Sequence, residues 1–147
     1  MITSNIYSPK TISVVSTIAT SLIILLFAYA AVSKLTDFET FRHQLHNQNI
    51  PKGLATPLAY IIPGVELLTI VLLLRSRTFQ AGLLLSMLLL AGFTAYVGLV
   101  LFHYWNKVPC SCGGILNHMS WTFHFWFNCF FLCIAIAAYI LTRPQKF

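Results

Sequence analysis

Long apolar runs separated by short polar segments dominate this sequence. Four of the runs are long enough to cross the hydrocarbon core of a bilayer as helices, which takes about 20 residues each. They lie at about residues 11–32, 57–74, 79–102 and 121–141. The pattern predicts an all-α, polytopic membrane protein in which four helices form one bundle.

The longest polar segment, residues 36–56, lies between the first and second predicted spans. Phe38, Phe41 and Leu45 recur there at helical spacing, and Ile50-Pro51 ends the pattern. An amphipathic pattern of this kind is typical of a helix that lies in the membrane interface. We therefore expect a short interfacial helix here; a lid over the outer end of the bundle is the alternative.

Composition supports the membrane assignment. Hydrophobic residues make up 58% of the 147 residues, and charged residues only 8%. A soluble domain has about a quarter of its residues charged, because its surface must remain in water. The lipid bilayer must therefore solvate most of this surface, and nothing in residues 1–147 predicts a second domain.

The net charge of +6 does not indicate nucleic-acid binding, because the basic residues stand at the ends of apolar runs and form no stripe. The side that carries both predicted termini has Lys10, Arg75, Arg77, Arg143 and Lys146, and the opposite side has Lys34, Arg42, Lys52 and Lys107. The side that carries the termini thus has five basic residues against four on the other side. This small excess of basic residues predicts that the termini lie in the cytoplasm, at a bacterial inner membrane. The loop before the fourth span would then face the periplasm.

That loop contains the sequence Pro109-Cys110-Ser111-Cys112-Gly113-Gly114. A disulfide between two cysteines one residue apart closes a small, strained ring, which is easily reduced and suits exchange. The glycines let the backbone turn sharply beside the sulfur atoms. Cys110 and Cys112 are therefore candidate catalytic residues of a thiol–disulfide oxidoreductase.

A soft-metal site is a second interpretation of the same loop. Cys110 and Cys112 would then be joined by some of His103, His118 and His124. The usual zinc spacing places two to four residues between the cysteines, which this loop does not match. An inert cysteine pair is the third interpretation.

Cys129 and Cys133 lie four residues apart within the fourth predicted span. This spacing on a regular helix is poorly suited to a disulfide, so both are expected to be small packing residues. A relay of electrons from the loop cysteines to these thiols is the alternative.

Glu66 is the only acidic residue within an apolar run, and it follows Pro63-Gly64. Because an ionisable group is costly in lipid, Glu66 should face the bundle interior and have a partner there. It would be either a proton carrier or a hydrogen bond between helices. His124, near the start of the fourth span, would be either a proton donor to the cysteines or a partner of Glu66 or of a carbonyl.

Four segments together resemble the MauE branch of the MauE/DoxX membrane proteins. They are Ser33-Lys34-Leu35-Thr36-Asp37-Phe38, Pro63-Gly64-Val65-Glu66-Leu67, the cysteine-glycine loop 109–114, and residues 120–128. The resemblance covers about residues 12–141. It implies a four-helix membrane bundle similar to that of the vitamin K epoxide reductases, and a redox role.

Carried over to this chain, that role falls on Cys110 and Cys112. The family's name-giving member is linked to maturation of a disulfide-rich periplasmic subunit of methylamine dehydrogenase. The partner would be a thioredoxin-like or other extracytoplasmic thiol protein. Unlike the vitamin K epoxide reductases, this chain has no Cys-x-x-Cys in its last span, which weakens the case for an internal relay and for a quinone as electron acceptor.

Three functional hypotheses follow. The first is an inner-membrane thiol–disulfide protein that uses Cys110 and Cys112, assisted by His124 and Glu66. The second is a non-catalytic membrane subunit that docks or assembles a partner complex, and the third is a soft-metal carrier.

Overall fold

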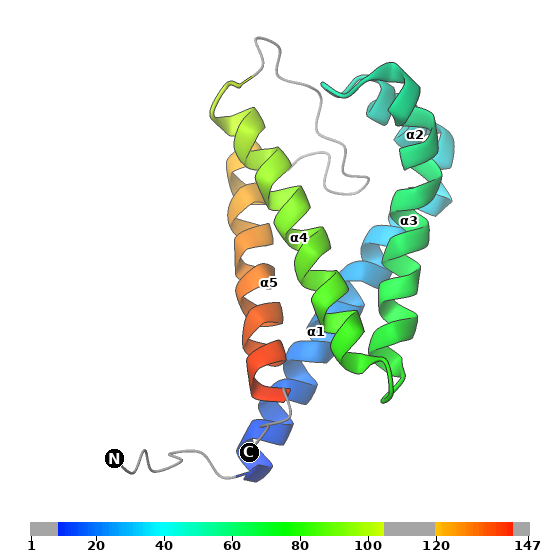
Figure 1. Cartoon of the computed structure of the whole chain (residues 1–147). Helices are drawn as coiled ribbons and strands as arrows, with labels where there is room; N and C mark the ends of the chain where they lie inside the picture. Colours follow the sequence, from blue (N-terminus) through cyan, green and yellow to red (C-terminus); the bar gives the residue numbers. More distant parts are fainter. Residues whose placement is uncertain (1–8, 105–119, 143–147) are drawn as a thin grey trace.

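The computed structural model describes residues 9–104 and 120–142 (Figure 1). Within these ranges the chain is helical, with no strand. Its helices are α1 (Pro9–Thr36), α2 (Phe38–His46), α3 (Lys52–Leu74), α4 (Phe79–Leu101) and α5 (Trp121–Thr142). All but α2 are long and apolar enough to cross a membrane. The predicted all-α, multi-pass architecture is confirmed.

Two helices extend beyond the predicted spans of about residues 11–32 and 57–74. Helix α1 extends from Pro9 to Thr36, and α3 begins at Lys52 instead of Pro57. Pro57 thus lies inside α3, although proline cannot donate the backbone hydrogen bond of a helix. It is tolerated one turn inside α3, where the neighbouring Ala55 and Ala59 are fully buried.

The four long helices form a ring in which each packs against two others. Helix α1 contacts α3 and α5, and α4 contacts the same two helices from the opposite side. Helices α3 and α5 are therefore diagonal neighbours. The described end of α4 and the start of α5 lie at the same end of the bundle as α2, as Figure 1 shows.

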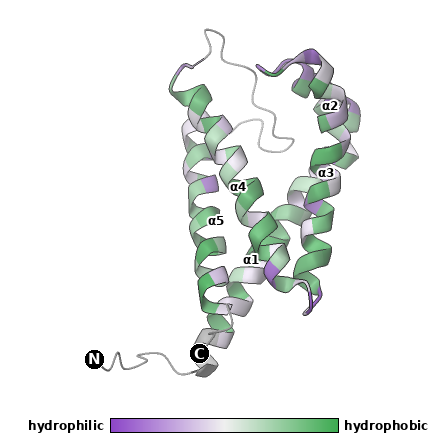
Figure 2. Ribbon diagram, viewed as in Figure 1, coloured by the Kyte–Doolittle hydropathy of each residue, from purple (hydrophilic) through white to green (hydrophobic). Residues whose placement is uncertain are grey.

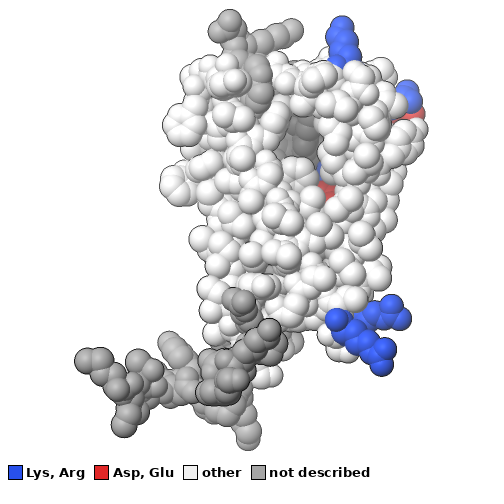
Figure 3. Space-filling view, viewed as in Figure 1, with Lys and Arg blue, Asp and Glu red and all other residues white. Residues whose placement is uncertain are grey.

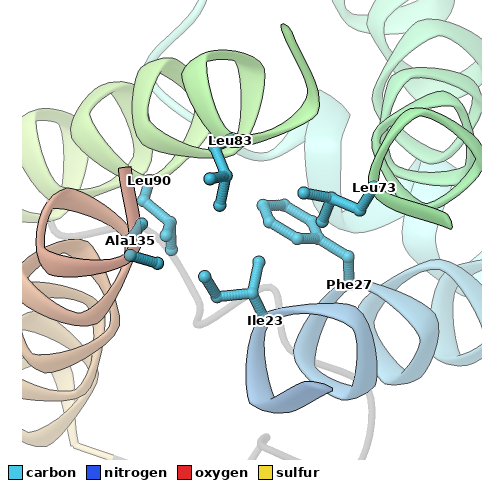
Figure 4. Packing of buried hydrophobic residues seen from close by; sticks show 7 residues of the cluster. Ile23, Phe27, Leu73, Leu83, Leu90 and Ala135 are labelled. Carbon is cyan, nitrogen blue, oxygen red and sulfur yellow. The ribbon is translucent and has the colours of Figure 1, made fainter. Parts of the chain in front are cut away.

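Apolar side chains fill the middle of the ring. Ile23 and Phe27 of α1 meet Leu73 of α3, Leu83 and Leu90 of α4, and Ala135 of α5 (Figure 4). The long helices are hydrophobic along most of their length, as Figure 2 shows, and many of their large apolar side chains are exposed. Lipid covers such a surface, because water would be a poor solvent for it.

Helix α2 is the predicted short helix between the first two spans. Asp37 caps its start by accepting a hydrogen bond from the backbone N–H of Thr40 at 3.3 Å. Phe41 and Leu45 are buried against Ala55 and Ala59 of α3 in a second apolar cluster. This cluster holds α2 on the first turns of α3.

A hydrogen bond joins this end of the chain to the other side of the ring. The hydroxyl of Tyr96 on α4 donates to Oε1 of Gln48, just after α2, at 2.6 Å. The link matters because α2 packs mainly on α3. Through Gln48, the segment that follows α2 is also attached to α4.

The crossing of α3 and α4 depends on Gly82. A Cβ atom at this position would lie 2.8 Å from the backbone nitrogen of Leu73. We therefore expect Gly82→Ala to push the two helices apart and to lower the free energy of unfolding by about 1–3 kcal/mol. Thermal unfolding in detergent, followed by circular dichroism, measures this.

Gly92→Ala is the matched control on the same helix. Nothing lies within 4 Å of a Cβ added at Gly92, and alanine favours helices over glycine by about 1 kcal/mol. This variant should be as stable as the parent protein or slightly more stable. Equal effects of the two substitutions would contradict the close packing assigned to Gly82.

Candidate functional site: a polar layer at the α2 end of the bundle

An ion pair joins α1 to α3 inside the bundle. Nζ of Lys34 donates a hydrogen bond to Oε1 of Glu66 at 2.8 Å. The Glu66 side chain is 1% exposed and that of Lys34 is 20% exposed. The prediction that Glu66 faces the interior and has a partner there is therefore confirmed, and the partner is Lys34.

Three different groups hold the Lys34 ammonium. Besides Glu66, it donates to the carbonyl oxygen of Ala30 at 3.1 Å, and it lies 5.8 Å from the centre of the Phe41 ring. The face of an aromatic ring attracts a cation. Lys34 thus connects α1, α2 and α3, and it is a fixed cation within the bundle.

Lys34 was wrongly assigned to a loop. The polar residues that follow it made it resemble a charge just outside the first span, but α1 continues to Thr36. The Lys34 side chain points back into the bundle and pairs with Glu66. Its positive charge is therefore internal.

The ion pair lies one heptad from the apolar core. Lys34 follows Phe27 of that core by seven residues on α1, and Glu66 precedes Leu73 by seven residues on α3. Seven residues are about two helical turns, so each pair shares a face and is separated by about 10 Å along its helix. Because α1 and α3 run in opposite directions, both steps lead toward the α2 end.

Helix α5 adds a third polar residue to this level. Asn128 precedes Ala135 of the apolar core by the same seven residues and is 5% exposed. On α4 the corresponding step from Leu90 leads to Val97, which is also buried. We call Lys34, Glu66 and Asn128 the polar layer.

His124 lies one turn from Asn128, toward the start of α5. Ser120 caps this helix: its hydroxyl oxygen accepts from the N–H of Phe123 at 3.2 Å, and its carbonyl from the N–H of His124 at 3.0 Å. The imidazole is half-buried, and the charge of Lys34 acts on it electrostatically. The fold therefore brings His124 and the Lys34–Glu66 pair to the same end of the bundle.

Cys110 and Cys112 lie outside the described residues, as does His118. Cys129 and Cys133 are free thiols on α5, the first half-buried and the second exposed on the outer surface. They form no disulfide, as their spacing predicts.

The described part of the chain contains no group of three or more His, Cys, Asp or Glu side chains that could hold a metal ion. His103 is exposed at the end of α4, with a φ of 52°. Every set of ligands proposed above for a soft metal includes Cys110 and Cys112, which lie outside the described residues. The soft-metal interpretation therefore stays a prediction.

The sequence did not lead us to predict Lys34 as the partner of Glu66. It also did not lead us to predict Asn128 as a site residue. Each stands seven residues from an apolar residue of the core on the same helix, but the structure is needed to show that this apolar residue is buried. The sequence could not show which apolar residues of different helices meet at one level.

The ion pair can be tested through its effect on stability. Lys34→Met leaves the buried Glu66 carboxylate without its cation, and breaking a buried pair in this way costs about 3–5 kcal/mol of unfolding free energy. Lys34→Met combined with Glu66→Leu should recover much of this loss, because no charge remains buried. Thermal unfolding of the single and double variants measures the difference.

Arg42 and Glu39 on α2 provide the control, since they form an ion pair of 2.7 Å that is largely exposed. Arg42→Met should change stability by less than about 1 kcal/mol. Suppose the double variant at positions 34 and 66 is no more stable than Lys34→Met. The unpaired Glu66 carboxylate would then not be the cause of the lost stability.

A comparison with known protein families matches most of the chain. The family model described as methylamine utilisation protein MauE matches residues 12–141, which include all of α2, α3 and α4 and nearly all of α1 and α5. Comparisons with curated proteins and with solved structures found no significant match. Because the family model covers most of its length, this multi-pass membrane protein belongs to the MauE family.

Proposed function

We propose that this protein is an inner-membrane thiol–disulfide oxidoreductase. Cys110 and Cys112 cycle between a dithiol and a disulfide and support disulfide formation or maturation of an extracytoplasmic partner. The family description points to a partner in methylamine utilisation. A thioredoxin-like or other periplasmic thiol protein has the chemistry that this exchange requires.

One observation carries the proposal. The end of α4 and the start of α5, which flank the cysteine segment in the sequence, lie at the α2 end of the bundle (Figure 1). Cys110 is six residues from Tyr104, so a chain extended at about 3.5 Å per residue keeps it within about 21 Å of that end. The polar layer and His124 lie at the same end.

The exchange is balanced between two proteins. A thiolate of one protein attacks a disulfide sulfur of the other, which gives a mixed disulfide and releases a thiolate. The second thiol of the attacking protein then resolves the mixed disulfide. One dithiol is oxidised and one disulfide is reduced, so no further oxidant is consumed in the step itself.

His124 suits the role of base in this step. The attacking group must be a thiolate, and an imidazole can take up the thiol proton near neutral pH. His124 is held in the first turn of α5, and the segment that contains the cysteines leads into this turn. Glu66, paired with Lys34, contributes fixed charge deeper in the bundle.

The charge distribution supports a periplasmic position for the cysteines. With Lys34 inside the bundle, the loops on the cysteine side retain Arg42, Lys52 and Lys107 as basic residues. The opposite side keeps the five basic residues named above. The excess favours a cytoplasmic location for both termini under the positive-inside rule.

Thiol trapping in intact cells tests the proposal. A membrane-impermeant, mass-shifting maleimide should label Cys110 and Cys112 only after reductant is added, because the pair is oxidised at rest. The Cys110→Ser, Cys112→Ser double variant should lose this labelling and the maturation of the partner, with no change in thermal stability.

Cys129→Ser and Cys133→Ser form the matched control, since both thiols are free on α5. This double variant should keep the labelling and the activity. Loop labelling that never responds to reductant would argue for the metal carrier, which bound metal in the purified protein would reveal. Partner maturation that survives loss of both loop cysteines would argue for the docking subunit.

A second test addresses His124. We expect His124→Gln to slow reduction of the loop disulfide by a dithiol peptide by about tenfold at neutral pH, because the base is lost. The rate should recover at higher pH, where hydroxide supplies the thiolate. His43→Gln, an exposed histidine on α2, is the control and should leave the rate unchanged. A rate deficit at position 124 that is the same at every pH would indicate a purely structural role.

A further inference from the structure

Two buried polar atoms of the polar layer have no hydrogen-bond partner among the described residues. They are Oε2 of Glu66, an acceptor, and Nδ2 of Asn128, a donor. The other carboxylate oxygen of Glu66 is occupied by Lys34. A buried polar group left without a partner costs about 1–3 kcal/mol, so such atoms indicate a place where something binds.

The two atoms belong to diagonal helices at one level of the bundle. Glu66 on α3 and Asn128 on α5 each stand seven residues from a residue of the apolar core, on the side toward α2. Val97 on α4, seven residues from Leu90 of the core, is buried and adds no polar group. The acceptor and the donor therefore face the interior from opposite sides of the ring.

Charged atoms are visible from the surface at this end of the molecule. Figure 3 shows a hollow in the half that carries α2, between the side formed by α4 and the side formed by α2 and α3. Acidic and basic atoms are visible inside it, although the surrounding surface is uncharged.

We propose that the polar layer is a binding site for a hydroxyl group, which donates to Oε2 of Glu66 and accepts from Nδ2 of Asn128. A hydroxyl satisfies both atoms at once, because it carries one donor and two acceptor lone pairs. A carbonyl oxygen would serve only Asn128, and an ammonium group would serve only Glu66 while lying close to the Lys34 cation. The hydroxyl belongs either to a water molecule or to a membrane-dissolved alcohol or phenol.

The site does not depend on the cysteine chemistry. Its three side chains come from α1, α3 and α5, and its binding can be measured without any thiol reaction. Failure of the redox proposal would leave it intact, and the reverse also holds.

The experiment compares phenol with toluene, which has a methyl group in place of the hydroxyl. Each is titrated against the full-length protein in nanodiscs, and the shift in thermal unfolding midpoint gives its affinity. Phenol should stabilise the parent protein more than toluene does. Asn128→Leu, which keeps the size of the side chain but removes the donor, should weaken phenol binding about tenfold, because it removes one hydrogen bond.

Water as the occupant gives a different result. Phenol and toluene would then act alike, but Asn128→Leu would lower the midpoint without any additive. The infrared spectrum of the parent protein would also contain a water O–H band that shifts in ¹⁸O-labelled water and is missing from the variant. Either occupant supports the site.

The proposal is overturned if phenol has no advantage over toluene and Asn128→Leu is as stable as the parent protein or more stable. An apolar residue would then simply have replaced an unsatisfied amide. Glu66→Gln is the second variant and should also reduce the advantage of phenol. Ser86→Ala is the control, because the Ser86 hydroxyl is buried but bonded to the carbonyl of Leu83, and it should leave phenol binding unchanged.

Discussion

Two opposite charges inside a membrane remain there only if they stay together, and this constraint governs how α1 and α3 are placed. Lys34 must lie at the level of Glu66, which fixes the vertical register of the two helices. A shift of α1 by one turn would separate the charges by about 5 Å and leave each in low dielectric. The apolar core below could tolerate such a shift more easily, because packing between aliphatic side chains is less specific.

Much of the fold could be predicted because each membrane span is a local property of the sequence. A run of about 20 apolar residues must span the bilayer wherever its neighbours lie. The interior position of Glu66 was predictable for the same reason, since the cost of a carboxylate in lipid does not depend on its partner. The identity of that partner depends on how two helices are aligned, and no local pattern around Lys34 contains this information.

The site was therefore only partly predictable. Glu66 and His124 could be selected by their chemistry, and the structure places both at the α2 end of the bundle. Asn128 could not, because a single amide among the aromatic residues of α5 resembles an ordinary packing position. Its relation to Glu66 emerges only when Leu73 and Ala135 are found in the same apolar core. The role of Cys110 and Cys112 stays a prediction from their spacing and from the family.

The two apolar clusters have a consequence for how the molecule opens. One lies in the middle of the ring, and the other joins α2 only to the first turns of α3. The Lys34 ammonium beside the Phe41 ring and the hydrogen bond from Tyr96 to Gln48 connect the second cluster and the segment after α2 to the rest. Local unfolding follows such divisions, since a small cluster can separate while the larger one remains intact. Backbone amides of α2 should therefore exchange with deuterium by a sub-global opening, well before those of α4. The α2 end is thus the part of the molecule that can open without loss of the membrane bundle.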